Sequence, residues 1–272
     1  MDALTSSLCD CHVHVFDPAF PLAPGASYVP PVATVDKLMA MHRALGVGRV
    51  VVVQSTVYGF DNRCTMAAVA AITELGGAAR AVVTVHAAAT DDELQALHSG
   101  GARGVRFMMA GGGVLPWEAL ESVAARIQPL GWHINLQLNG CELPQHLDRL
   151  ARLPTPLVID HIGKFMPPPV TDAETFGALR TLMDSGRCWV KLSAPYESSR
   201  SGPPAFDDVS LLATELARAY PERCLWASNW PHPNRNPLPD DAAMLDLLSA
   251  WAPSAATRQR ILVDNPQALY GF

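Results

Sequence analysis

The sequence lacks an excess of positive charge, because 20 Lys and Arg residues stand against 26 Asp and Glu residues, for a formal net charge of −6. Nucleic-acid-binding domains carry a basic face, so we expect no nucleic-acid partner. Long apolar runs are also missing, since none approaches the ~18 residues that cross a bilayer. We therefore expect no membrane span, and the acidic balance mainly favours solubility.

The first ten residues, MDALTSSLCD, lack the apolar segment of a secretory signal peptide, so we expect a cytoplasmic protein. Cysteines are few and scattered: Cys9, Cys11, Cys64, Cys141, Cys188 and Cys224. In a reducing compartment they are expected to be free thiols. Cys9 and Cys11 alternate along one predicted strand, and no second cysteine pair completes a zinc site.

Eight short apolar runs alternate with longer stretches of helical periodicity. The runs span 8–15, 49–54, 79–85, 104–108, 133–138, 157–161, 188–193 and 224–228. Several consist almost wholly of Val, Ile and Leu, which is typical of strands covered on both faces. Helices are expected at 34–46, 90–101, 117–131, 174–186 and 210–220. Such alternation predicts parallel strands joined by crossover helices.

A single (β/α)8 barrel of the TIM type, spanning residues 1–272, accommodates this pattern best. A doubly wound open sheet is the alternative. It is disfavoured because the segment HVHVFDPAF follows the first strand, where that fold has a glycine-rich phosphate-binding turn. Proline-rich segments follow predicted strands one, six, seven and eight. In a parallel barrel these loops share one rim, where active sites lie.

Histidines mark the ends of two predicted strands. His12 and His14 are two residues apart and therefore share one face of the first strand. Paired imidazoles suit metal ligation or hydrogen bonding to one substrate oxygen, although satisfied core histidines are the alternative. The motif DHIGK places His161 at the rim of the sixth strand. Asp160 faces the other way, and either pairs locally or orients one of the histidines.

Charged residues inside apolar strands require an explanation, because burying a charge without a partner is costly. Arg106 in GVRFM lies where it can hold a carboxylate through two hydrogen bonds, a structural salt bridge being the alternative. Lys191 in WVKLS is the second such residue. Gln137 and Tyr196 are further polar residues that can reach the predicted rim.

The segment LWASNWPHPN raises a specific question about Asn229. An Asp at this position would serve as a base for hydrolysis, whereas an amide neither takes up nor releases a proton near neutral pH. His232 lies between two prolines, which fix the neighbouring backbone. It is either a substrate-binding residue or part of a rigid turn with an exposed imidazole.

The motifs DCHVHVFD, VIDHIGK, WASNWPHPN and ILVDNPQALYGF together resemble the amidohydrolase superfamily. The branch concerned contains 2-pyrone-4,6-dicarboxylate lactonase and the sugar-lactone hydrolases and isomerases, and the likeness covers nearly the whole chain. It implies a distorted barrel that acts on a lactone, a cyclic ester. It also places His12, His14, His161, Arg106 and Tyr28 on positions that line such sites.

The resemblance implies a metal-free site in which histidines and an arginine polarise the ester carbonyl, with an Asp base at the position of Asn229. Two further arginines of the dicarboxylate lactonase are absent here, and Gln137 replaces a tyrosine. These departures favour a hydroxylated sugar lactone or a small aromatic-pathway lactone as substrate. The alternative cofactor is one Zn²⁺ on His12, His14 and His161.

Three functions are compatible with these residues. A lactone hydrolase is the first, with His12, His14, His161 and Asn229 as catalytic residues and Tyr28, Arg106, Gln137, Lys191, Tyr196 and His232 as substrate-binding residues. A lactone isomerase, in which a hydroxyl of the substrate attacks the carbonyl, suits Asn229 directly. A non-catalytic binding protein, or a variant in which Asn229 was introduced to trap a ligand, is the third. The expected partner is a small lactone, and the expected state is a monomer or small homo-oligomer.

Overall fold

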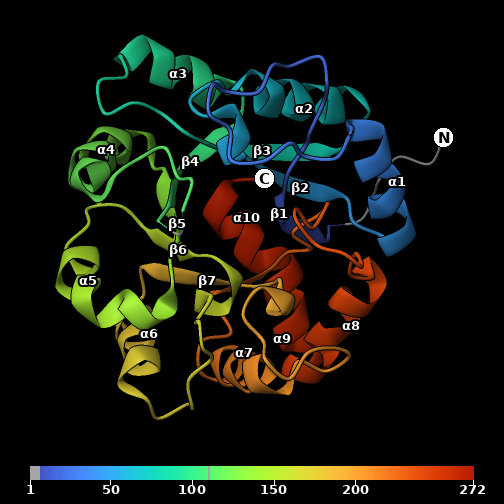
Figure 1. The fold of residues 1–272 in the computed structure, drawn as a ribbon, viewed down its shortest axis with the longest axis vertical. Helices are drawn as coiled ribbons and strands as arrows, with labels where there is room; N and C mark the ends of the chain where they lie inside the picture. The colour runs from blue at the N-terminus through green and yellow to red at the C-terminus, as the bar shows by residue number, and fades with distance from the viewer. Residues whose placement is uncertain (1–6, 110) are drawn as a thin grey trace.

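The computed structural model describes residues 7–109 and 111–272. Eight strands form one sheet in the order in which they occur in the chain (Figure 1). They are β1 (Cys9–Val13), β2 (Arg49–Val53), β3 (Ala78–Val83), β4 (Ala102–Met108), β5 (His133–Gln137), β6 (Leu157–Ile159), β7 (Cys188–Leu192) and β8 (Cys224–Trp226). Each successive pair is parallel. Sequential order with parallel pairing is that of a barrel and not of a doubly wound sheet.

The sheet closes through the segment that follows β8. The amide nitrogen of Asn229 donates to the carbonyl of His12 at 3.0 Å, and the amide of His14 donates to the carbonyl of Trp230 at 2.8 Å. The predicted (β/α)8 barrel is therefore confirmed. The two segments that carry the paired histidines and Asn229 meet at the closing seam.

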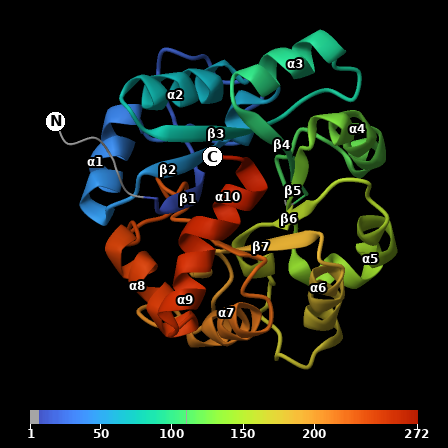
Figure 2. The ribbon, with the colours of Figure 1, turned by 180° about the vertical axis from the view of Figure 1, so that it is seen from behind.

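Helices surround the barrel (Figures 1 and 2). They are α1 (Val35–Leu45), α2 (Arg63–Glu74), α3 (Asp91–Ser99), α4 (Leu120–Ile127), α5 (Leu143–Ala151), α6 (Glu174–Asp184), α7 (Asp207–Ala219), α8 (Asp241–Trp251), α9 (Ala255–Gln259) and α10 (Asn265–Tyr270). The periodic stretches named above correspond to α1, α3, α4, α6 and α7. Helices α2, α5, α8, α9 and α10 lie outside them.

Local signals account for several helix ends. Gly46 ends α1 in the left-handed conformation, with φ of 70°, which glycine adopts without steric cost. Thr90 and Glu93 form a reciprocal capping box at the start of α3, satisfying two backbone donors. None of the helices in the described part of the chain combines the length and apolarity that a bilayer crossing requires.

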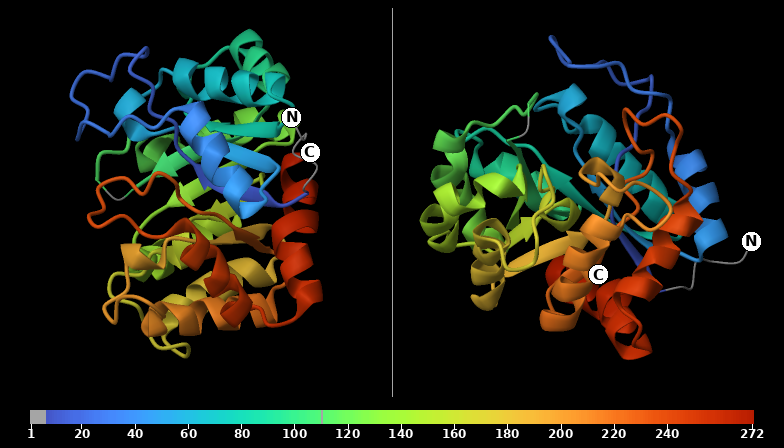
Figure 3. Two further views of the ribbon diagram at one scale, coloured as in Figure 1. Left: turned by 90° about the vertical axis from the view of Figure 1, so that its right-hand side faces the viewer. Right: turned by 60° about the horizontal axis from the view of Figure 1, so that its bottom comes forward.

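One end of the barrel is filled by the carboxyl-terminal helix. Tyr270 of α10 is fully buried and packs with Cys9, Cys11, Val51 and Val158, whose side chains point into the barrel. The loops after β1 and β8 project from the opposite side of the molecule (Figure 3, left). A ligand site is therefore confined to the end where those loops lie. The six cysteines, all within the described residues, form no disulfide.

Candidate active site

A cavity of about 270 Å³ lies at the carboxyl ends of the strands. Its lining includes six of the ten residues predicted to form the site: His14, Tyr28, Arg106, Gln137, His161 and Asn229. Three larger cavities, of about 470, 630 and 340 Å³, lie along α2, along α3 and in the loop after β1, and are lined by none of the ten. The other four predicted residues, His12, Lys191, Tyr196 and His232, do not line the 270 Å³ cavity but contact residues around it.

The ring of His14 is held by the backbone of β2. Its Nδ1 lies 2.7 Å from the carbonyl oxygen of Val53, and because a carbonyl only accepts, Nδ1 carries the proton. Burial, reinforced by the Arg106 charge, lowers the pKa of His14 to about 3, so the ring is neutral. Its Nε2 therefore offers a lone pair, and Nε2 of His12 lies 3.2 Å away.

Lys191 lies beneath His12 and fixes its tautomer. The Lys191 ammonium lies 3.1 Å from Nδ1 of His12, 2.6 Å from Oδ1 of Asn135 and 3.0 Å from Oδ1 of Asp160. An ammonium only donates, so Nδ1 of His12 accepts and its Nε2 carries the proton toward His14. The Lys191 side chain is completely buried and does not line the cavity.

Burial lowers the pKa of Lys191, and the Asp160 carboxylate is the partner that opposes this shift. Burial alone would raise the pKa of the Asp160 carboxyl, but the Lys191 ammonium and His12 hold it well below its ordinary value. Asn135 donates to its second oxygen at 2.8 Å. The sequence pattern leaves open whether Asp160 pairs locally or orients a histidine. Its ion pair with Lys191 is a local pairing, and because Nδ1 of His12 accepts from Lys191, the carboxylate 3.3 Å from that atom acts on the histidine only through the lysine.

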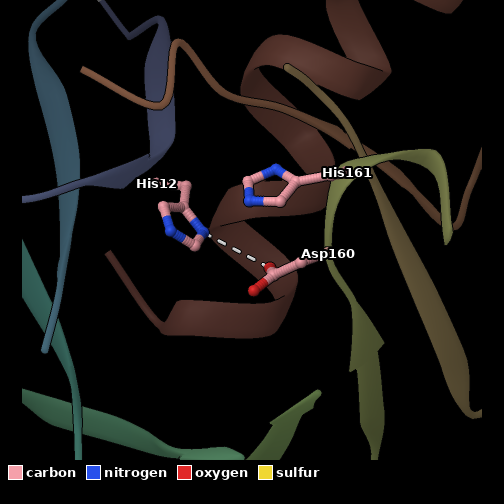
Figure 4. A group of neighbouring side chains, drawn as sticks. All are labelled: His12, Asp160 and His161. Carbon is pink, nitrogen blue, oxygen red and sulfur yellow. Dashed lines mark ion pairs between the residues drawn. The ribbon is translucent and has the colours of Figure 1, made fainter. Parts of the chain in front are cut away.

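A metal ion fits these residues poorly. Within the described residues one group of potential ligands holds its atoms within 4.8 Å of one another, namely His12, Asp160 and His161 (Figure 4). The Lys191 ammonium already contacts both His12 and Asp160, so a cation placed there would face an existing positive charge. The set named from the sequence, His12, His14 and His161, is not the group that the fold assembles.

His161 enters the cavity from a strained turn directly after β6. Its φ is 55°, a left-handed value that non-glycine residues rarely adopt and that recurs at functional sites. Nδ1 lies 2.9 Å from the Ser193 hydroxyl. Burial lowers the pKa of His161 to about 4, so the ring is neutral near pH 7. No contact of Nε2 with the described residues competes for that atom.

Arg106 is held by two neighbours and keeps hydrogens for a ligand. Nη1 donates to the carbonyl of Gln54 at 2.7 Å, and Nη2 donates to Oε1 of Gln137 at 3.1 Å. Each of these nitrogens carries a second hydrogen. Burial lowers the pKa of Arg106, yet an arginine stays charged at neutral pH. Gln137 thus lines the cavity and also orients the guanidinium.

Three charged residues that line the cavity are not among those predicted from the sequence. Lys164 and Arg235 each lie 2.9 Å from Glu197, and all three line the cavity. They come from the loops after β6, β7 and β8, where no periodicity indicates which side chain turns inward. The available signal was a charged residue beside a proline-rich segment in each loop. With Arg106, the cavity holds three cations against one carboxylate.

Asn229 stands at the end of a chain of hydrogen bonds. Its Nδ2 lies 3.0 Å from the Tyr196 hydroxyl, which lies 2.7 Å from Nδ1 of His232. Nε2 of His232 is 3.0 Å from a carboxylate oxygen of Asp241, the first residue of α8. Tyr196 therefore hydrogen-bonds to Asn229 and His232, and His232 also bonds to Asp241. The sequence pattern predicts that Tyr196 and His232 bind substrate.

The family model described as Amidohydrolase matches residues 9–272. The chain belongs to the amidohydrolase family. It is 40% identical to a 2-pyrone-4,6-dicarboxylate hydrolase of Comamonas testosteroni, over 98% of this chain and 91% of that protein. It is 36% identical to a D-galactarolactone isomerase of Agrobacterium fabrum, over 96% and 90% of the two chains.

A 4-sulfomuconolactone hydrolase of Rhizobium radiobacter is 36% identical over 99% of this chain and 91% of its own. Among solved structures, an apo crystal structure from Agrobacterium tumefaciens superposes with a TM-score of 0.93 at 35% identity, covering 99% of this chain and 97% of that one. The predicted family and barrel are thus confirmed.

Proposed function

We propose that the chain is a lactone hydrolase whose substrate is a small lactone bearing a carboxylate or another anionic group. The observation that carries this proposal is the cavity itself, in which Arg106, Lys164 and Arg235 face a single carboxylate, Glu197. The neutral rings of His14 and His161 leave that excess of positive charge uncompensated. Relatives named as hydrolases of a pyrone dicarboxylate and a sulfomuconolactone support the same substrate class.

Binding follows from the positions of the cations. Arg106, fixed by Gln54 and Gln137, donates its remaining hydrogens to the lactone carbonyl oxygen and stabilises the negative charge that develops there. Lys164 and Arg235 attract the pendant anionic group of the substrate. Tyr28 lines the same cavity and is free to contact the ring.

His161 is the base in this mechanism. In the tautomer with its proton on Nδ1, which the Ser193 hydroxyl 2.9 Å away accepts, Nε2 takes a proton from the attacking water, whose oxygen forms a bond to the carbonyl carbon. A pKa of about 4 makes this imidazole about as basic as an ordinary aspartate, whose pKa is about 3.9. When the ring ester bond breaks, the departing oxygen takes the proton back from His161.

Isomerisation is the second candidate, and the amide of Asn229 favours it. A hydroxyl already attached to the substrate is held near the carbonyl, so proximity replaces part of the assistance that a base gives. A relative named D-galactarolactone isomerase supports this candidate. Hydrolysis has the broader support, because relatives named for two different lactones are hydrolases.

The test uses matched pairs of lactones with the same ring, one bearing a free carboxylate and the other its methyl ester. Loss of a charge-assisted hydrogen bond costs about 1.5–3 kcal/mol, so kcat/KM should be roughly 10- to 150-fold higher for the carboxylate. Arg106→Met should lower kcat/KM for both members. Equal rates on both members would refute the anionic substrate, and the absence of turnover across the panel would refute the lactonase.

A further inference from the structure

Asn229 differs from an aspartate in that its two side-chain atoms are not equivalent. A carboxylate presents an acceptor whichever oxygen faces the substrate, whereas a carboxamide presents either an acceptor or a donor. The orientation of this one side chain therefore decides what a bound nucleophile meets. The contacts behind Asn229 determine that orientation.

The hydrogen-bond chain is assigned from its far end. The Asp241 carboxylate accepts, so Nε2 of His232 carries a hydrogen and donates at 3.0 Å. The Tyr196 hydroxyl lies 2.7 Å from Nδ1 of the same ring and donates to it. Burial raises the pKa of Tyr196 above its ordinary value, so the phenol keeps that hydrogen. The phenol oxygen accepts from Nδ2 of Asn229 at 3.0 Å, which leaves Oδ1 directed away from Tyr196.

Two residues of this hydrogen-bond chain have an unusual backbone conformation. Asn229 and His232 have φ of 64° and 55°, left-handed values that are uncommon for non-glycine residues, although Asn and His adopt them more readily than most. The amide of His232 donates to the carbonyl of Asn229 at 2.9 Å and closes the turn. The Arg235 guanidinium lies over the Tyr196 ring, 5.2 Å from its centre, and restricts the ring from its other side.

We propose that Tyr196, His232 and Asp241 are positioning residues that hold the Asn229 carboxamide with Oδ1 toward the cavity, where it accepts a hydrogen bond from the attacking water. None of the three lines the cavity. The role of the water depends on the lactonase proposed above, whereas the orientation of Asn229 is a property of the free protein. The two are therefore tested separately.

The kinetic test places Tyr196→Phe in two backgrounds, the parent and Asn229→Asp. In the parent, the amide loses its anchor and kcat should fall roughly 2- to 10-fold, the value of one hydrogen bond, with little change in KM. In Asn229→Asp the same change should have little effect on kcat, because both carboxylate oxygens accept. Equal losses in the two backgrounds would show that Tyr196 acts only as structural support.

The second test needs no substrate. The side-chain NH₂ signals of Asn229, identified by their absence from Asn229→Asp in a ¹⁵N-labelled protein, should exchange slowly with water in the parent. Tyr196→Phe and Asp241→Asn should each speed that exchange. Tyr220→Phe, which removes a surface hydroxyl bonded to Asp184, is the matched control and should leave it unchanged.

Unchanged exchange in Tyr196→Phe would overturn the positioning proposal, whether or not a lactone is turned over. Faster exchange together with no turnover of any lactone would retain the positioning of Asn229 and refute the proposed function instead. A folded Tyr196→Phe variant is verified by its circular dichroism and unfolding midpoint before either comparison.

Discussion

The ammonium of Lys191 lies 3.1 Å from Nδ1 of His12, and this contact decides which nitrogen of the histidine carries the proton. The lysine reaches His12 from β7, across the interior of the barrel, and shares Asp160 with it. Its role is therefore to set the hydrogen bonding of the paired histidines from below. The Lys191 ammonium, which the sequence pattern predicts to bind substrate, is paired with the Asp160 carboxylate.

Removing the charge of Lys191 or of Asp160 alone should destabilise the fold far more than removing both charges. Lys191→Met leaves the Asp160 carboxylate buried without its cation, and such changes cost about 3–5 kcal/mol of the free energy of unfolding. Lys191→Met combined with Asp160→Asn removes both charges and should recover most of that loss. Urea unfolding of the three proteins measures it. Equal stability of the single and double variants would show that the pair is not coupled.

Buried neutral histidines should make the fold sensitive to acid. Burial lowers the pKa of His14 and His133 to about 3 and that of His161 to about 4. Unfolded histidines titrate near 6.5, so between about pH 6.5 and 4 the unfolded chain binds more protons. Stability should therefore fall as pH drops through that window, by about 1.4 kcal/mol per pH unit for each such histidine.

His133→Phe isolates one of these contributions, because neither ring nitrogen of His133 has a hydrogen-bond partner. The variant should be as stable as the parent at pH 7 and should lose stability less steeply toward pH 4. Denaturant titrations at several pH values supply the slopes. Identical slopes for both proteins would mean that His133 keeps an ordinary pKa in the fold.

Turnover should not depend on a metal ion. The Lys191 ammonium occupies the space beside the His12 and Asp160 ligand atoms, so a divalent cation would have to displace it. Lactone turnover should survive extended treatment with a chelator and should not rise when Zn²⁺ is added. Elemental analysis that finds a stoichiometric metal, together with activity lost to chelation and restored by that metal, would overturn this expectation.

Asn229→Asp should raise hydrolysis. It introduces a carboxylate of nearly the same volume at the cavity, and a positioned base supplies at most roughly 10²–10⁴-fold. The profile of kcat/KM against pH should gain an acid limb set by the new carboxyl group. Asn229→Ala, which neither accepts nor titrates, should fall below the parent. Hydrolysis no faster in Asn229→Asp than in the parent would show that no base can act from this position.

Much of the barrel was predictable because its determinants are local. Runs of Val, Ile and Leu mark strands buried on both faces, and the two-residue spacing of His12 and His14 puts both on one face. The position of Arg106 near the end of its strand follows from the same reasoning. The depth of a side chain along the barrel axis was not predictable, because the same sequence pattern is compatible with Lys191 at the rim or deep in the interior.

The loop residues escaped prediction for a different physical reason. Lys164 has a left-handed φ of 45° and Arg235 lies in an irregular loop, and no periodicity reports where such side chains point. The hydrogen bonds that link Asn229, Tyr196 and His232 join segments that come together only when the barrel closes. The sequence pattern predicts all three as site residues, with Tyr196 and His232 in contact with substrate.

The central claim, that this cavity adds water across a lactone bond, is tested most directly by turnover in ¹⁸O-labelled water. Mass spectrometry of the product from a carboxylated lactone should show one ¹⁸O in the newly formed carboxyl group, at a rate well above the protein-free control. The same label should be nearly absent with Arg106→Met at matched times. A product of unchanged mass and altered chromatographic mobility would show isomerisation instead, and would contradict the account.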